Sequence, residues 1–145
     1  MTQIQNSKQY DLEERTARFA ESCRDFIKKL PRTTANFEYG KQLIRSSGSQ
    51  AANYIEANEA LSKKDFVMRI KICRKETKES CLWLRLCEVG EGEKLEEERI
   101  RLIKEAGELR NIFTAILNKS QITSTKLQTN SNDSNSKFKT CLEFW

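Results

Sequence analysis

Apolar residues recur along this chain at intervals of three and four, the spacing that places side chains on one face of an α-helix. The clearest example begins at Ser62, which with Asp65 resembles a helix-capping box, and ends near Val89. One apolar stripe of this segment consists of Phe66, Ile70, Cys73, Thr77, Cys81 and Leu84. A second stripe, on the opposite side, consists of Met68, Ile72, Leu82, Trp83 and Leu86. Because a surface helix of a lone domain needs one apolar face, the second stripe predicts an interface with another chain.

Two further helices are predicted before this one. The first starts at Asp11, with Glu14 completing a second capping box, and is stopped by Pro31. Its stripe is Leu12, Thr16, Phe19, Cys23, Phe26 and Leu30. The second runs from residues 34–36 to about Ala60 and has a wide apolar arc made of two adjacent stripes. The stripes are Phe37, Ile44, Ala51 and Ile55, and Tyr39, Leu43, Tyr54, Ala57 and Leu61.

A fourth helix follows a turn that contains two glycines, at residues 88–93, and extends to about Asn118. Its stripe is Leu95, Leu102, Ala106, Leu109, Phe113 and Ile116, with Leu117 alongside. Its first turns are acidic (Glu93, Glu96, Glu97 and Glu98), which suits the positive end of the helix dipole. These carboxylates either pair with the basic 62–89 helix across a subunit boundary or only balance the surface charge.

Four helices with short connections predict an all-α fold, an antiparallel up-down-up-down four-helix bundle over residues 11–119. Residues 1–10 are polar and unpatterned, which favours a flexible N-terminal arm. Residues 120–145 include a Ser-, Thr- and Asn-rich stretch with too little apolar area to offset the entropy of ordering it. We therefore expect a disordered, low-complexity C-terminal tail, whose last residues, Cys141–Trp145, are apolar and aromatic.

Small and polar residues interrupt the apolar pattern of the 34–60 helix. Gly48 costs about 1 kcal/mol relative to alanine inside a helix, which suggests that another backbone comes close there. The neighbouring serines are best explained by close packing, with their hydroxyls bonded to backbone carbonyls. A polar line of Arg45, Asn53 and Glu56 is expected to be structural, with its members satisfying one another or partners on the neighbouring helix.

Composition argues against an enzyme. The chain has 145 residues, no histidine and five cysteines, and no CxxC pair occurs. We expect Cys23, Cys73, Cys81 and Cys87 to be reduced thiols in helical segments, and we expect no metal site and no cofactor. No apolar run is long enough for a membrane span and no signal peptide is evident, so a cytoplasmic location is expected.

A formal net charge of +5 mildly favours an acidic partner such as RNA or DNA. The candidate nucleic-acid-binding residues are Lys63, Lys64, Lys71, Arg74, Lys78 and Arg85, which lie at the start of the 62–89 helix and along one side of it. Two alternatives are that these charges are merely solvated or that they form salt bridges between subunits. No aromatic residue is interleaved with them, so base stacking is not indicated.

Several blocks of the sequence resemble the 23S rRNA intervening-sequence (S23-like) proteins, a bacterial family of four-helix bundles. The blocks are Leu30–Arg32, Tyr39–Ser49, Ala52–Ala57, Asp65–Phe66 and Lys75–Ser80. Their order and spacing match together over roughly Tyr10 to Lys119. The resemblance implies a barrel-shaped homopentamer with a central channel and no catalytic residues. A related branch, the accessory variability protein of diversity-generating retroelements, works beside a reverse transcriptase and binds nucleic acid through basic surface.

Residue pattern and resemblance together predict a non-enzymatic, oligomeric bundle that binds nucleic acid through a basic helix face. The alternative is a structural or protein-interaction scaffold without nucleic-acid binding. The partners expected are other copies of the chain, RNA or DNA, and a reverse transcriptase or another protein.

Overall fold

The computed structural model describes the backbone of residues 7–128 and the side chains of residues 12–121. Four helices make up this part of the chain, α1 (Ser7–Lys29), α2 (Thr34–Asn58), α3 (Lys63–Leu86) and α4 (Glu93–Gln128). No strand occurs among residues 7–128. The predicted all-α class is confirmed.

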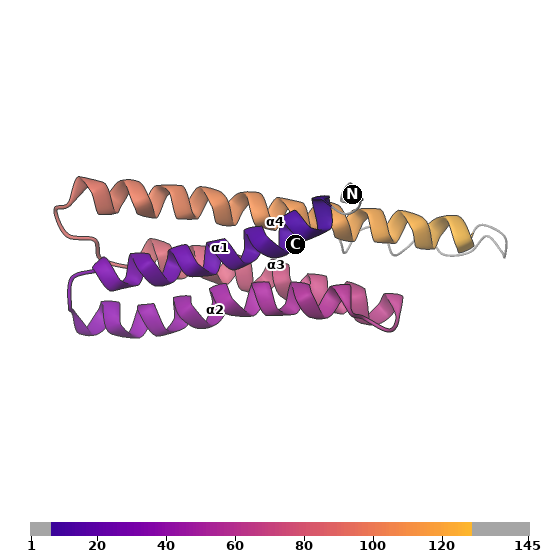
Figure 1. Cartoon of the computed structure of the whole chain (residues 1–145), viewed down its shortest axis with the longest axis horizontal. Helices are drawn as coiled ribbons and strands as arrows, with labels where there is room; N and C mark the ends of the chain where they lie inside the picture. The colour runs from indigo at the N-terminus through magenta and orange to yellow at the C-terminus, as the bar shows by residue number, and fades with distance from the viewer. Residues whose placement is uncertain (1–6, 129–145) are drawn as a thin grey trace, which may run out of the picture.

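The helices form an antiparallel bundle (Figure 1). The α1–α2 and α3–α4 connections lie at one end of the bundle, and the α2–α3 turn lies at the other. Each helix packs against the next in sequence, and α1 also packs against α4, which closes the ring of four. The predicted up-down-up-down order is therefore confirmed. No helix within the described residues is long and apolar enough to cross a membrane.

Helices α2 and α3 each begin directly after a capping residue. The Ser62 hydroxyl accepts a hydrogen bond from the backbone N–H of Asp65 at 3.1 Å, as predicted for the start of α3. The Thr33 hydroxyl caps α2 in the same way, accepting from the N–H of Asn36 at 3.1 Å. Each cap satisfies one of the N–H groups that have no partner inside the first turn.

The start of α1 and the end of α4 differ from the prediction. The first helix begins at Ser7 rather than Asp11, and the fourth continues to Gln128 rather than stopping near Asn118. These added turns are mostly polar, so apolar periodicity did not predict them. They are helical because backbone hydrogen bonds extend a helix once its packed part has formed. The expected disordered tail is thus wrong for residues 120–128, and its remainder lies outside the described residues, as does most of the predicted N-terminal arm.

The core largely follows the predicted stripes. All six residues of the first predicted stripe are buried, from Leu12 in α1 to Leu30 directly after it. Helix α3 buries Ile70, Cys73, Thr77 and Leu84, whereas Phe66 and Cys81 are half-buried. Helix α4 buries Leu102, Ala106, Leu109, Phe113 and Leu117.

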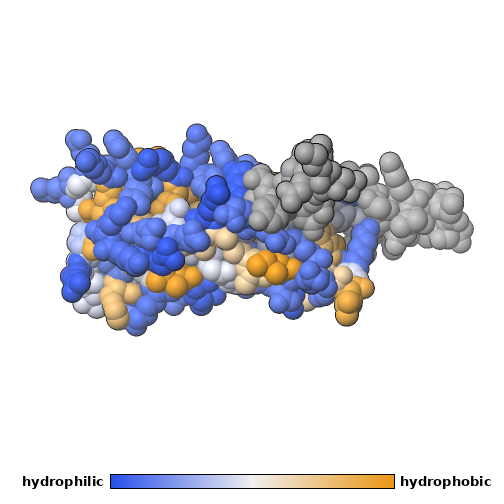
Figure 2. All heavy atoms as spheres, viewed as in Figure 1, coloured by the Kyte–Doolittle hydropathy of each residue, from blue (hydrophilic) through white to orange (hydrophobic). Residues whose placement is uncertain are grey.

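Helix α2 departs from the prediction, because only one of its two apolar stripes contributes to the core. Phe37, Ile44 and Ile55 are 65%, 52% and 51% exposed. Figure 2 shows the resulting apolar patches over α2 on this face of the molecule. A Cβ atom added at Gly48 would meet nothing within 4 Å, so no other backbone of this chain approaches it there. Leu61, placed in the second stripe, lies in the α2–α3 turn and is fully exposed.

The side of α2 that faces the core contains small polar residues. The Ser46 and Ser80 hydroxyls are 2.8 Å apart and share a hydrogen bond between α2 and α3. The Gln50 amide donates to the backbone carbonyl of Thr16 on α1 at 2.8 Å. Because the Ser46 hydroxyl and the Gln50 amide nitrogen bond to neighbouring helices, these groups can be buried at little cost, and the small Ser46 side chain allows α2 to pack closely against α3. The prediction that the serines serve packing is confirmed for Ser46.

The buried side chain of Asn36 links the α1–α2 and α3–α4 connections, which lie at the same end of the bundle. The Asn36 amide donates to the backbone carbonyls of Pro31 at 2.9 Å and Glu88 at 2.8 Å. Its side-chain oxygen accepts from the N–H of Glu88 at 2.8 Å. Asn36 therefore holds the α1–α2 loop against the residues that follow α3.

We predict that Asn36→Ala lowers the free energy of unfolding by roughly 3 kcal/mol, because it leaves three partly buried backbone groups without their partner. Urea denaturation followed by circular dichroism measures this loss. Asn118→Ala, an exposed change on α4, is the matched control and should alter stability by less than about 0.5 kcal/mol. Equal stability of the two variants would contradict the proposed role of Asn36.

Candidate nucleic-acid interface

A basic groove runs between α3 and α4. It has a volume of about 1010 Å³, and Leu82 contributes to its apolar floor. Its basic lining residues come from both helices and are Lys71, Arg74, Lys75, Lys78, Arg85 and Arg110. The structure thus brings four of the predicted nucleic-acid-binding residues to one hollow, with cations on both walls.

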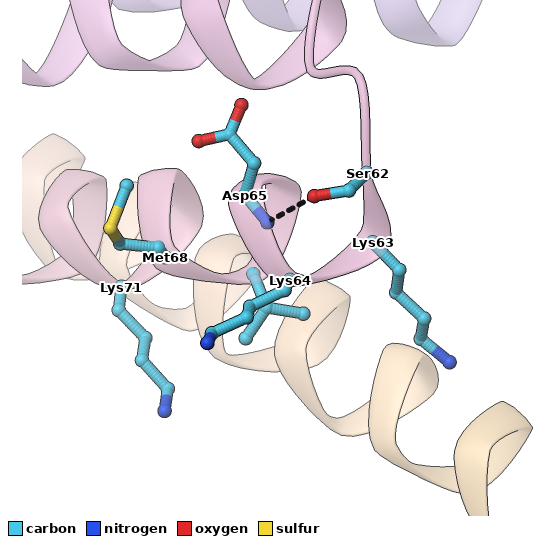
Figure 3. A pocket seen from close by; sticks show the side chains of 7 residues that line it. Ser62, Lys63, Lys64, Asp65, Met68 and Lys71 are labelled. Atoms are coloured by element: carbon cyan, nitrogen blue, oxygen red, sulfur yellow. Dashed lines mark hydrogen bonds between the residues drawn. The ribbon is translucent and has the colours of Figure 1, made fainter.

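The other two predicted residues line a second groove, of about 700 Å³, at the start of α3. Lys63 and Lys64 lie there beside Met68 and Lys71 (Figure 3). In this view the lysine side chains extend from α3 toward the side on which the α4 ribbon passes. Lys71 lines both grooves, so the predicted basic residues border one continuous surface along α3.

Two residues of this surface, Lys75 and Arg110, were not among the sequence-predicted candidates. Lys75 is one residue from Arg74 and faces solvent next to the stripe, so a wider helical arc would have included it. Arg110 comes from α4, and only the register of α3 against α4 brings it there. The 3.7 Å contact between the Cys81 thiol and the backbone carbonyl of Ile103 fixes part of this register.

The five residues of the predicted oligomer face of α3 differ in exposure. Met68, Leu82 and Leu86 are exposed, as an interface with another chain requires. Ile72 is half-buried. Trp83 is also half-buried, and its ring lies against Tyr39 of α2 with centroids 6.1 Å apart. Since Met68 and Leu82 line the two basic grooves, the predicted interface and the predicted nucleic-acid site share one surface.

Among the described residues that line the larger groove, Glu79 is the one with a carboxylate, and this carboxylate is paired with α2. Glu79 accepts from the Arg45 guanidinium of α2 at 2.6 Å, and Glu76 accepts from the same group at 3.4 Å. The charge of Glu76, followed by the hydrogen bond to Glu79, raises the pKa of Arg45. The α2–α3 seam therefore neutralises acidic groups that would otherwise weaken the positive field of the groove.

Two members of the predicted polar line on α2 contact the neighbouring helix α3. Arg45 pairs with α3 as described, and Asn53 accepts a hydrogen bond from Arg69 of α3 at 3.1 Å. Glu56 is exposed on the surface of α2.

Acidic residues of α4 pair within the chain with α1 rather than α3. Arg15 donates to Glu105 at 2.6 Å and to Glu108 at 2.6 Å, and the hydrogen bond with Glu105 is the main cause that raises the pKa of Arg15. Lys29 pairs with Glu98 at 3.0 Å. The α1–α4 seam is consequently mixed in charge, whereas the α3–α4 groove is basic.

The four cysteines among the described residues lie in or beside the packed interior. Cys23, Cys73 and Cys87 are buried and Cys81 is half-buried, and all four are free thiols. Burial raises the pKa of Cys73 from its ordinary value of 9.0 to about 12 and that of Cys87 to about 11. Burial likewise raises the pKa of Cys23. These groups are neutral near pH 7 and so are poor nucleophiles. Among side chains 12–121, no group of three or more acidic, Cys or His residues suits a metal ion.

The comparison with known proteins agrees with this architecture. Residues 8–115 match the model of the 23S rRNA-intervening sequence protein family. The chain belongs to this family. A similar solved structure is that of a protein of unknown function of the S23 ribosomal protein family from Bacteroides thetaiotaomicron, 27% identical, with a TM-score of 0.63. The match covers 73% of the present chain and 97% of that one. No curated protein is significantly similar to the chain.

For this intervening-sequence family member we predict a loss of stability at alkaline pH. Since the folded-state pKa of Cys73 and Cys87 lies above 9.0, their neutral forms stabilise the fold below about pH 9, and this stabilisation is lost as pH rises toward about 11 and 12. Each thiol contributes up to about 1.4 kcal/mol per pH unit in that window. Urea unfolding at several pH values measures the slope, which should be smaller for Cys73→Ala than for the parent chain. Parallel slopes would contradict the assignment.

Proposed function

We propose that this protein is a non-catalytic binding protein that holds RNA or DNA through phosphate contacts in the basic surface along α3 and α4. The observation that supports this most directly is the groove with Arg110 on the α4 wall and the α3 cations opposite. Cations on two walls can contact the backbone of a strand or duplex edge lying between them, which scattered surface lysines cannot do.

The chemistry of the groove favours recognition of the phosphate backbone rather than of bases. Among the described side chains, none that lines the two grooves is aromatic, so this lining provides no platform for stacked bases. Long, exposed lysine and arginine side chains adapt to a variable phosphate spacing. Binding is therefore expected to depend on salt and on the shape of the nucleic acid more than on its sequence.

We predict that replacing Lys71, Arg74 and Lys78 together by glutamine lowers the affinity for duplex DNA at least tenfold near 0.1 M salt. The slope of log affinity against log salt should fall by about 2.7, because each lost phosphate contact removes about 0.9. Fluorescence anisotropy with a labelled duplex and with a structured RNA, repeated across salt concentrations, measures both values and any preference between the two.

A matched control removes the same charge from another helix. Arg18, Arg24 and Lys28 are exposed on α1, and their triple replacement by glutamine should change the affinity less than threefold. If both triple variants lose affinity equally, net charge rather than the groove explains binding. If neither loses affinity, the groove is not the site.

A second candidate function is self-association, with the bundle as a subunit of a ring. The exposed apolar residues Phe37, Ile44 and Ile55 share one side of α2, and Gly48 leaves open space between them. Such a face accepts a helix at close range, because no side chain projects from its middle. A different apolar set is exposed on α3, and two distinct surfaces on each subunit are what a closed ring of identical copies requires. We propose the homopentamer on this basis, and a reverse transcriptase or another protein as a further partner of such a ring.

We predict that Ile44→Glu lowers the molecular mass measured by light scattering to that of a smaller assembly, because it introduces a charge into the apolar face of α2. Ile72→Glu tests the α3 face in the same way. Helix content should be retained, since Ile44 is half exposed in the bundle. Ala115→Glu, at an exposed position of α4, should leave the mass unchanged. An unchanged mass for both isoleucine variants would exclude both faces from the interface.

A further inference from the structure

The groove at the start of α3 differs in character from the larger groove beside it. Val67 and Met68 are its apolar lining residues. Lys64 and Lys71 line it as well (Figure 3). Met68 is exposed although it is a large apolar residue on a helix of the bundle. An apolar floor with cationic borders suits a short segment that combines apolar or aromatic side chains with a negative charge.

The chain itself contains a segment of this chemistry. Cys141–Trp145 reads Cys-Leu-Glu-Phe-Trp, with apolar residues on both sides of Glu143. Phe144 and Trp145 suit contact with the thioether of Met68 and with lysine ammonium groups, and Glu143 suits an ion pair with either lysine. Between Gln128 and this segment, the sequence is polar and rich in Asn and Ser, as in a flexible linker.

The register of α3 against α4 places the linker within reach of the groove. Cys81 of α3 contacts Ile103 of α4. Lys64 lies about 25 Å from Cys81 along α3. The same distance from Ile103 along the antiparallel α4 ends at Ser120, so Ser120 lies level with Lys64. Helix α4 ends at Gln128, about 12 Å further along the bundle axis. A flexible chain with the length and composition of residues 129–140 would span about 19 Å on average, which is enough for the segment to reach back to the groove. A tether of this length gives an effective concentration in the millimolar range, at which a weak contact is largely formed.

We propose that Cys141–Trp145 docks in the groove at the start of α3 of the same chain and, by covering Lys64 and Lys71, competes with nucleic acid for this end of the basic surface. The docking itself is independent of the proposed function, whereas the competition rests on it. The segment then acts as an internal competitor, which a nucleic acid displaces only if its phosphate contacts outweigh the tethered contact.

The docking is tested without any nucleic acid. In a Trp83→Phe chain, Trp145 is the only tryptophan, and the phenylalanine keeps an aromatic ring next to Tyr39. The acrylamide quenching constant of Trp145 should be at least twofold lower in this chain than after the further change Met68→Glu. Leu86→Glu, an exposed residue of the same apolar face outside the groove, should leave the quenching unchanged.

Equal quenching with and without Met68→Glu would overturn the docking. Protection that disappears on tenfold dilution would overturn the same-chain assignment, because docking within one chain does not depend on concentration. Protection that is equally lost in Leu86→Glu would also overturn it, because the contact would then lie outside the groove.

The competition is tested by replacing Leu142, Phe144 and Trp145 with serine in the otherwise unchanged chain. The affinity for duplex DNA should rise at least threefold, and an unchanged affinity would overturn the competition. Failure of the proposed function is recognised separately, because the Lys71, Arg74 and Lys78 triple variant would then bind as the parent chain does. The quenching result holds in either case.

Discussion

The close contact of α2 with its neighbours determines how the rest of the bundle is arranged. Ser46 bonds to Ser80 of α3, and Gln50 bonds to the backbone of α1 at Thr16, so polar groups lie where apolar ones are expected. Because this side of α2 is buried, its bulky residues Phe37, Ile44 and Ile55 face outward. The specific hydrogen bonds of the interior thus create an apolar face on the exterior.

Ion pairs between neighbouring helices determine which acidic side chains of the surface are neutralised. Arg45 at the α2–α3 seam and Arg15 at the α1–α4 seam each bind two carboxylates. Two acidic residues of α3 and two of α4 therefore pair with α2 and α1, and these are Glu76, Glu79, Glu105 and Glu108. What is left between α3 and α4 is a groove lined mainly by cations. A net charge of only +5 becomes a concentrated positive field in one place.

Apolar and basic residues share the outer side of α3. Met68 and Leu82 lie in the same grooves as the lysines and arginines, so a subunit, a nucleic acid and the C-terminal segment would all meet overlapping surface. This overlap couples the proposed activities, because any partner that covers α3 removes cations from the others. A subunit bound to the separate apolar face of α2 would leave the basic grooves free.

The sequence by itself determined the helices, their order and most of the core, because helical periodicity and capping depend on residues a few positions apart. The α1 stripe and the Ser62 cap are examples, as is the basic side of α3. Only the tertiary structure decided which α2 stripe is buried and that Arg110 joins the basic groove, because both depend on register between helices. The hydrophobic pattern also did not predict the extension of α4 to Gln128, because these polar turns carry no apolar stripe. Contacts between residues distant in sequence have no local signal, and these contacts turn a basic stripe into a groove.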